Sequence, residues 1–143
     1  MARRDNDPFL GNAFLILSGE VIQAGFNECT GLGTETEVVE YREGNEDITV
    51  RKLPGLKKFG AVTLKRGVGT GTEMFNWIKS VMDGDIQRIS LSIAQLDEAR
   101  NEVLRYELSN AWPSKWTGPE WKAGASEVAI EQLEICYEDL RLA

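Results

Sequence analysis

The chain has 143 residues, of which 42% are hydrophobic and 27% are charged, and its formal net charge is −7. This length and composition suit a single soluble domain over residues 1–143 and exclude a disordered chain. The excess of acids, 23 against 16 bases, argues against tight binding to nucleic-acid phosphates. The longest apolar run, residues 13–17, is far below the roughly 20 residues of a membrane-spanning helix.

The N-terminus does not have the composition of a secretion signal. Arg3 and Arg4 are followed by acidic residues and Pro8, where a signal peptide needs an apolar core. We therefore expect synthesis and assembly in the cytoplasm, and we expect residues 1–6 to be a flexible polar terminus.

Two hairpins are predicted in the first part of the chain. Residues 13–17 and 21–26 are apolar and flank a short glycine-containing turn. Residues 34–42 and 48–53 flank a second turn, in which Gly44-Asn45 suits positive φ. Apolar residues are sparse and interleaved with charges in this second hairpin. We therefore expect it to extend as an arm that buries little surface against its own domain.

The arm is predicted to end in a turn. Pro54 and Gly55 suit the central pair of a type II turn, at which the chain reverses direction, so that arm and turn together span residues 34–58. Residues 59–66 then alternate in polarity and predict a strand, which closely spaced glycines interrupt.

A helix follows. Thr70 and Glu73 have the spacing of a capping box, and Gly84 supplies a stop signal. Between them lies an apolar stripe at helical spacing, formed by Met74, Trp77, Ile78, Val81 and Met82. We expect this stripe to pack on a sheet rather than to line a ligand pocket.

The remaining residues predict three strands. Residues 89–94 and 103–108 alternate in polarity on either side of a polar turn and form a hairpin. In residues 127–137, Val128 and Ile130 have the opposite parity to the apolar residues that follow, which predicts a bulge or a strand whose ends are buried on different faces. The fold class is therefore mainly β, an antiparallel β-sandwich or barrel with one packed α-helix and an extended β-hairpin arm.

Catalytic and metal-binding patterns are weak. The chain contains no histidine, which excludes imidazole chemistry. The acids between Glu35 and Asp47 could form a carboxylate pair for glycoside hydrolysis, but an exposed arm is a poor cleft. The glycines before the helix lack the Gly-Lys-Ser/Thr of a phosphate loop. Cys29 and Cys136 are isolated, so we expect idle thiols, with a disulfide between them as the alternative. We predict no catalytic residue, no cofactor and no metal.

The charges around the arm are unevenly distributed. Acids dominate residues 35–47, whereas bases dominate residues 51–66. These blocks can face each other as cross-strand ion pairs of small energy. They can also belong to a head-to-tail contact between copies of the chain. The charge pattern alone does not separate these two interpretations.

Several sequence blocks resemble one known family. They are Asp7-Pro8-Phe9, Gly31-Leu32, Glu40 to Asn45, Arg51 to Gly60, Val62 to Gly67, Leu96-Asp97-Glu98, Asn110 to Pro119 and Glu127 to Glu131. In this order and approximate spacing they resemble the tail tube family of contractile phages and extracellular contractile injection systems. The resemblance covers nearly the whole chain, from about Asp7 to about Glu138, and Cys29 is a small departure from it.

The resemblance implies a structural role. Subunits of this family join into hexameric rings, and the rings stack into a hollow tube that a contracting sheath drives into a target. The implied partners are further copies of the chain, the sheath protein, baseplate or tube-initiator proteins, tube-cap proteins and cargo in the lumen. The resemblance implies neither a catalytic residue nor a stable small-molecule ligand. The tryptophans of Asn110 to Trp121 are expected in the core, with contacts to neighbours or sheath as the alternative.

By the same resemblance, the arm reaches a neighbouring subunit or ring. The residues expected at contacts between subunits or rings are Glu35, Glu37, Val38, Glu40, Tyr41, Arg42, Glu43, Val50, Arg51, Lys52, Leu53, Pro54, Lys57 and Lys58. The blocks around Pro54-Gly55 and Trp112 to Lys115 most resemble those of extracellular injection particles, so the resemblance implies such a particle, with a phage tail tube that conducts DNA as the alternative within the family. Outside the family, the alternative is a soluble β-barrel that binds a small apolar ligand in one enclosed pocket.

Overall fold

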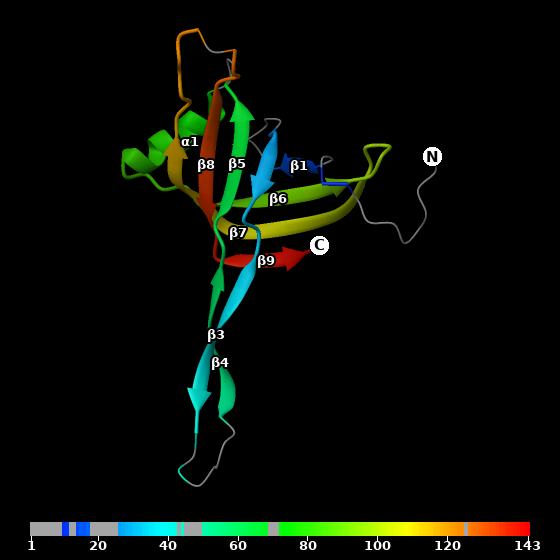
Figure 1. Cartoon of the computed structure of the whole chain (residues 1–143), viewed down its shortest axis with the longest axis vertical. Helices are drawn as coiled ribbons and strands as arrows, with labels where there is room; N and C mark the ends of the chain where they lie inside the picture. Colours follow the sequence, from blue (N-terminus) through cyan, green and yellow to red (C-terminus); the bar gives the residue numbers. More distant parts are fainter. Residues whose placement is uncertain are drawn as a thin grey trace.

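The computed structural model describes residues 10–11, 14–17, 26–42, 44, 50–68, 72–124 and 126–143. In these residues the chain forms a β-rich body with one helix at its side, and a two-stranded arm projects from the body along the long axis of the molecule (Figure 1). The elements are β1 Phe14–Leu17, β2 Glu28–Thr30, β3 Thr34–Tyr41, β4 Arg51–Phe59, β5 Val62–Gly67, α1 Glu73–Met82, β6 Ile89–Leu96, β7 Glu102–Thr117, β8 Ile130–Cys136 and β9 Asp139–Leu142. The predicted fold class is confirmed. Among the described residues, no helix is long and apolar enough to cross a membrane.

The body is a seven-stranded antiparallel sheet with the order β1-β6-β7-β8-β5-β2, and β9 also pairs with β7. The 16-residue strand β7 connects its two halves, because its first part pairs with β6 and β9 and its last part with β8. One extra residue interrupts the β6–β7 register near Asn110, whose φ is 53°, and a second interrupts the β7–β8 register near Ser114. Bulges of this kind bend a strand and increase its twist, so β7 can pair with strands in both halves of the sheet.

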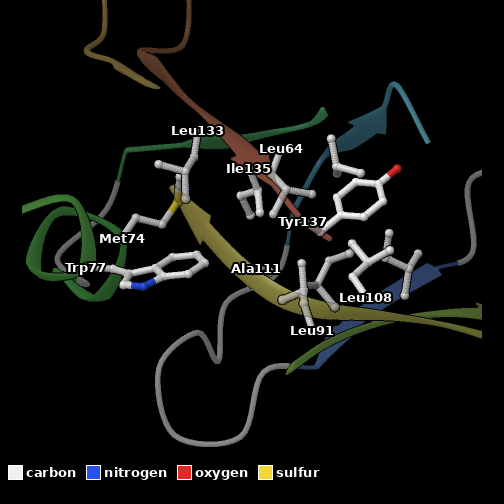
Figure 2. Packing of buried hydrophobic residues seen from close by; sticks show 12 residues of the cluster. Leu64, Met74, Trp77, Leu91, Leu108, Ala111, Leu133, Ile135 and Tyr137 are labelled. Carbon is white, nitrogen blue, oxygen red and sulfur yellow. The ribbon is translucent and has the colours of Figure 1, made fainter. Parts of the chain in front are cut away.

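The core lies between the two halves of the sheet and α1. Leu64, Leu91, Leu108 and Leu133 are fully buried there, and the helix adds Met74 and Trp77. Figure 2 shows these side chains converging from β5, β6, β7, β8 and α1. The core is therefore completed by strands that are distant in sequence.

The helix packs as predicted, with two differences. Met74, Trp77 and Ile78 are buried, and helix α1 ends before Gly84, which has a φ of 83°. Met82, however, is exposed. The predicted capping box is wrong, because the N-cap is Thr72 and Glu73 is already the first helical residue.

The predicted turn at Pro54-Gly55 is wrong. Strand β4 runs straight through these residues, and Pro54 lies opposite Val38 of β3. The register of the two strands shifts by one residue between Thr36 and Val38, so the Pro-Gly pair lies beside a bulge rather than in a reversal. An edge strand tolerates proline because its missing N–H is not needed by a second neighbour. The predicted strand 59–66 is divided, since β4 ends at Phe59 and β5 begins at Val62.

The first predicted hairpin is only partly described. Strand β1 pairs with β6, while residues 18–25, which include most of the expected second strand, lie outside the described residues. At the other end of the chain, β7 extends to Thr117, well beyond the predicted 103–108 hairpin strand. The short strand β9 was not predicted.

Strand β8 explains the change of parity noted in the sequence, although neither predicted explanation is correct. Its pairing with β5 is continuous, without a bulge in β8. Leu133 and Ile135 face the core, and the next core-facing position toward the N-terminus holds Glu131, which is 7% exposed. Ile130 and Val128 are left on the outside. A buried acid therefore occupies the position where an apolar residue was expected.

Candidate self-assembly surface

The arm consists of β3 and β4, and it is almost entirely exposed. Every residue of β3 is exposed, and within β4 only Gly55 and Phe59 are partly buried. Val38, Val39, Tyr41 and Leu53 are large apolar or aromatic side chains with 45–59% of their surface exposed. Grouped apolar exposure of this kind usually marks a site of association.

The strand register sorts the arm into two faces. Val39 lies opposite Leu53, and two residues further along Tyr41 lies opposite Arg51, so Val39, Tyr41 and Leu53 share one face. We call these three residues the arm face. The other face carries Val38 opposite Pro54. Gly55 allows close packing within the arm, because a Cβ there would lie 3.1 Å from both the Glu37 carbonyl oxygen and the Val39 side chain.

The acidic and basic blocks meet within the arm. Glu35 lies opposite Lys58, and Glu40 lies opposite Lys52. This register supports the cross-strand interpretation of the charge pattern, and all four side chains remain exposed. Exposed pairs contribute little to stability, so these charges stay available to a partner surface.

Thirteen of the fourteen residues predicted at contacts lie in the described part of the chain. Glu43 is not described, while the other thirteen are exposed residues of β3, β4 and the adjoining chain. Lys57 is also close to the body. The Arg141 side chain is the main cause that lowers the pKa of Asp139, and Lys57 adds to this effect.

The root of the arm is tightly fixed to the body. The Gly60 N–H donates to the Gly33 carbonyl oxygen at 3.0 Å, and the Tyr137 hydroxyl donates to the same oxygen at 3.2 Å. The rings of Phe59 and Tyr137 have centroids 5.7 Å apart. Burial raises the pKa of Tyr137 above its ordinary value. The direction of the arm is therefore set by the body.

A glycine at this root allows a direct test. Gly31 has a φ of 89°, and a Cβ there would overlap the Ala61 carbonyl oxygen. Gly31→Ala is expected to lower the free energy of unfolding by about 2 kcal/mol or more, through backbone strain and collision. Gly33→Ala is the matched control, because a Cβ at Gly33 meets no atom within 4 Å. Equal thermal unfolding of the two variants would contradict the described root.

A second exposed apolar surface lies at the other end of the body. Val128 and Ile130 are 74% and 45% exposed, and Val68 beside them is exposed as well. The Val68 N–H donates to the Ala129 carbonyl oxygen at 2.9 Å, which holds the two segments together. Val68 continues the β5–β8 ladder opposite Ala129, so it faces the other side of the sheet from Ile130. We call Val128 and Ile130 the end patch. The sequence pattern did not predict this exposed surface, although the change of parity at Ile130 was a signal of it.

The tryptophans of Asn110 to Trp121 have different environments. Trp116 packs partly buried against the core, and its ring lies edge-on to Phe75 with centroids 5.4 Å apart. Trp121 is 79% exposed, so the core prediction is wrong for this residue.

A hollow of about 330 Å³ lies between β1, β2 and β6 and is lined by Phe14, Cys29, Ile93 and Tyr106, among others. The amide of Gln95, which also lines it, donates to the backbone carbonyls of Leu10 and Leu96 at 2.9 and 3.1 Å. This polar group is therefore engaged with the chain itself. Among the described residues, no group of acids and cysteines could hold a metal ion.

Cys29 and Cys136 are both free thiols. Burial raises the pKa of Cys29 to about 11 from its ordinary 9.0. Because the thiolate is the reactive form, Cys29 is expected to react about 100-fold more slowly in the folded than in the unfolded chain at pH 8. Alkylation followed by mass spectrometry would measure the two reaction rates. Equal rates before and after unfolding would contradict the burial of this thiol.

The raised pKa of Cys29 also stabilises the folded chain below pH 9, and this contribution to stability is lost as the pH rises through about 11.

Comparisons with known proteins agree with this architecture. The family model for T4-like virus tail tube protein gp19 matches residues 11–141. A chain from the cryo-EM structure of the anti-feeding prophage (AFP) baseplate has a TM-score of 0.85 and 27% identity, with 96% of each chain covered. A chain from the AFP tube-terminating cap has a TM-score of 0.86 and 25% identity, with 100% of this chain and 94% of that chain covered.

A third structure has the same fold. A chain from the sheath–tube complex of the extracellular contractile injection system PVC, in the extended state, has a TM-score of 0.87 and 24% identity, with 97% of this chain and 93% of that chain covered. No curated protein sequence matches the chain significantly. The match over residues 11–141 shows that the chain belongs to the T4-like virus tail tube protein gp19 family, whose members are structural tube proteins.

Proposed function

We propose that this chain is a structural subunit of the inner tube of an extracellular contractile injection system. Hexameric rings of the chain stack into a hollow tube, which sheath contraction drives into a target. The observation that carries this proposal is the arm. Its root is hydrogen-bonded to the body, and it exposes apolar side chains that the body of the same subunit does not cover. Membership of the tail tube family and the likeness to an AFP baseplate chain support it.

The thirteen described arm residues and Glu43 form the proposed contacts between subunits or rings. In this arrangement Val38, Tyr41 and Val50 become buried only on assembly. The sheet edges at β1, β2 and β9 are where strands of adjacent subunits would join into one lumen wall. Such joining removes exposed edges, which otherwise favour aggregation.

The proposed partners are the chain itself, a sheath protein, baseplate or tube-initiator proteins, a tube cap and cargo in the lumen. Two relatives in the comparisons come from a baseplate and from a tube cap. The chain is proposed to be assembled in the cytoplasm and then to act as part of an extracellular particle. Its proposed role is structural, in assembly rather than in catalysis. A small-ligand β-barrel is less favoured, because it leaves the exposed arm unexplained.

Mass measurement tests this proposal. Size-exclusion chromatography with light scattering should find the purified chain, of 16.0 kDa, in assemblies built from multiples of six subunits. A monomer that persists as the concentration is raised would overturn it.

Charge on the arm gives a further prediction. Glu40→Lys combined with Glu43→Lys is expected to impair ring stacking and to leave the thermal unfolding of the subunit nearly unchanged, because exposed arm charges contribute little to the body. Light scattering and calorimetry would measure the two effects. Assembly that also weakens as salt is added would show that charge pairing governs it. A large loss of subunit stability would contradict this account of the arm.

A further inference from the structure

The end patch exposes apolar side chains that the fold of the isolated subunit does not need at the surface. At the start of β8, the core-facing position holds Glu131, and the apolar Ile130 faces outward. Across the sheet, Ile130 lies opposite Gly67, which has no side chain to cover it. Val128 packs beside this position, since a Cβ on Gly67 would lie 3.6 Å from its Cγ1. The result is a small, open apolar surface at the end of a strand pair.

The arm face and the end patch lie at opposite ends of the molecule. Figure 1 shows the arm projecting from one end of the body, while the β5 and β8 ends that carry the patch are at the other end of the long axis. One copy therefore cannot cover its own patch with its own arm. Two different surfaces at opposite ends suit a heterologous, head-to-tail contact, which repeats along a stack.

Charges beside the two surfaces are complementary. Glu127 is exposed next to Val128, and Arg51 is exposed on the arm face, opposite Tyr41. Opposite charges at the rim of an apolar contact favour one orientation over the other. A second copy of the chain thus offers both the apolar surface and the charge that the end patch needs.

We propose that the end patch is the receptor for the arm face of a copy in the adjacent ring. The arm side chains Val39, Tyr41 and Leu53 cover Val128 and Ile130, and Arg51 approaches Glu127. This inference rests on the proposed function, since it names the surface that receives the arm between stacked rings.

Cross-linking between two variants tests the receptor. One variant carries Leu53→Cys, the other Val128→Cys, and the wild-type chain measures any background from its own thiols. Under mild oxidation the mixture should give a disulfide-linked dimer that neither variant gives alone. A chain with both substitutions should give a ladder of multimers. Val103→Cys replaces Val128→Cys as the control, because Val103 is also an exposed valine but lies outside the end patch, at the start of β7. It should give no dimer with Leu53→Cys.

A charge exchange provides the second readout. Glu127→Arg and Arg51→Glu should each reduce tube length in electron micrographs, and the two substitutions together should restore it. If wild-type chains stack into tubes but the mixed variants do not cross-link, or if Val128→Cys cross-links to itself, the receptor assignment is wrong and the proposed function stands. If wild-type chains never assemble, the proposed function itself fails.

Discussion

Glu131→Ala is expected to lower the free energy of unfolding by about 3–5 kcal/mol, because it removes the carboxylate that faces a buried guanidinium. The Arg66 Nε donates to Glu131 Oε1 at 2.6 Å, and each side chain is 9% exposed. The Trp116 indole N–H also donates to Glu131, at 3.4 Å. Chemical denaturation of the purified variant measures this loss.

Two further variants test whether the loss of stability depends on the burial of this ion pair. Glu102→Ala removes an ion pair of the same 2.6 Å length, with Arg105, but at the surface, and it should change stability little. Arg66→Met combined with Glu131→Leu replaces both charges with apolar side chains, and it should be close to neutral or stabilising. If Glu131→Ala is no more harmful than Glu102→Ala, the buried pair does not have the role described here.

The second large effect is expected on assembly rather than on folding. Val39→Asp combined with Leu53→Asp places two charges on the arm face, and it should abolish tubes, since desolvating a charge at an apolar contact is costly. The melting temperature should hardly change, because both side chains are about half exposed in the subunit. Electron microscopy and calorimetry of one preparation would measure both.

Val103→Asp is the matched control for this arm variant. Val103 has similar exposure but lies on the body rather than on the arm, so its substitution should leave tubes intact. Tubes that persist in the arm variant would show that the arm face is not a contact. A large fall in its melting temperature would show that the arm is part of the folding core.

Sequence patterns predicted the elements whose signals are local. The spacing of Met74, Trp77 and Ile78 predicted the packed face of α1, and the sparse apolar content of residues 34–53 predicted an exposed hairpin. These signals succeed because helical and strand periodicities are properties of short segments. The sparse apolar content of the hairpin also predicted that most of the contact residues are exposed.

The errors have a common physical origin. Pro54-Gly55 was predicted to be a turn, and Asn110 and Pro113 lie beyond the predicted end of the 103–108 strand, yet each lies in a strand beside a bulge or register shift. Bulges and edge strands accept these residues because the pairing partner leaves room for them, and that partner is distant in sequence. Short-range patterns therefore ended β7 too early and placed a reversal in β4.

The end patch was missed for a related reason. An isolated strand pattern assigns apolar residues to the core, so Val128 and Ile130 were expected to be buried. Glu131 pairs instead with Arg66, 65 residues away, and occupies the core-facing position, so Ile130 and Val128 face outward. A contact of that sequence separation becomes visible only when the strand register of β5 and β8 is known.

Negative-stain electron microscopy of the purified chain tests the central claim most directly. A tube subunit should give rings with an open centre, and at higher concentration hollow tubes with a regular ring repeat along their length. Particles that remain single subunits of uniform size at high concentration would contradict the claim that this chain builds a tube.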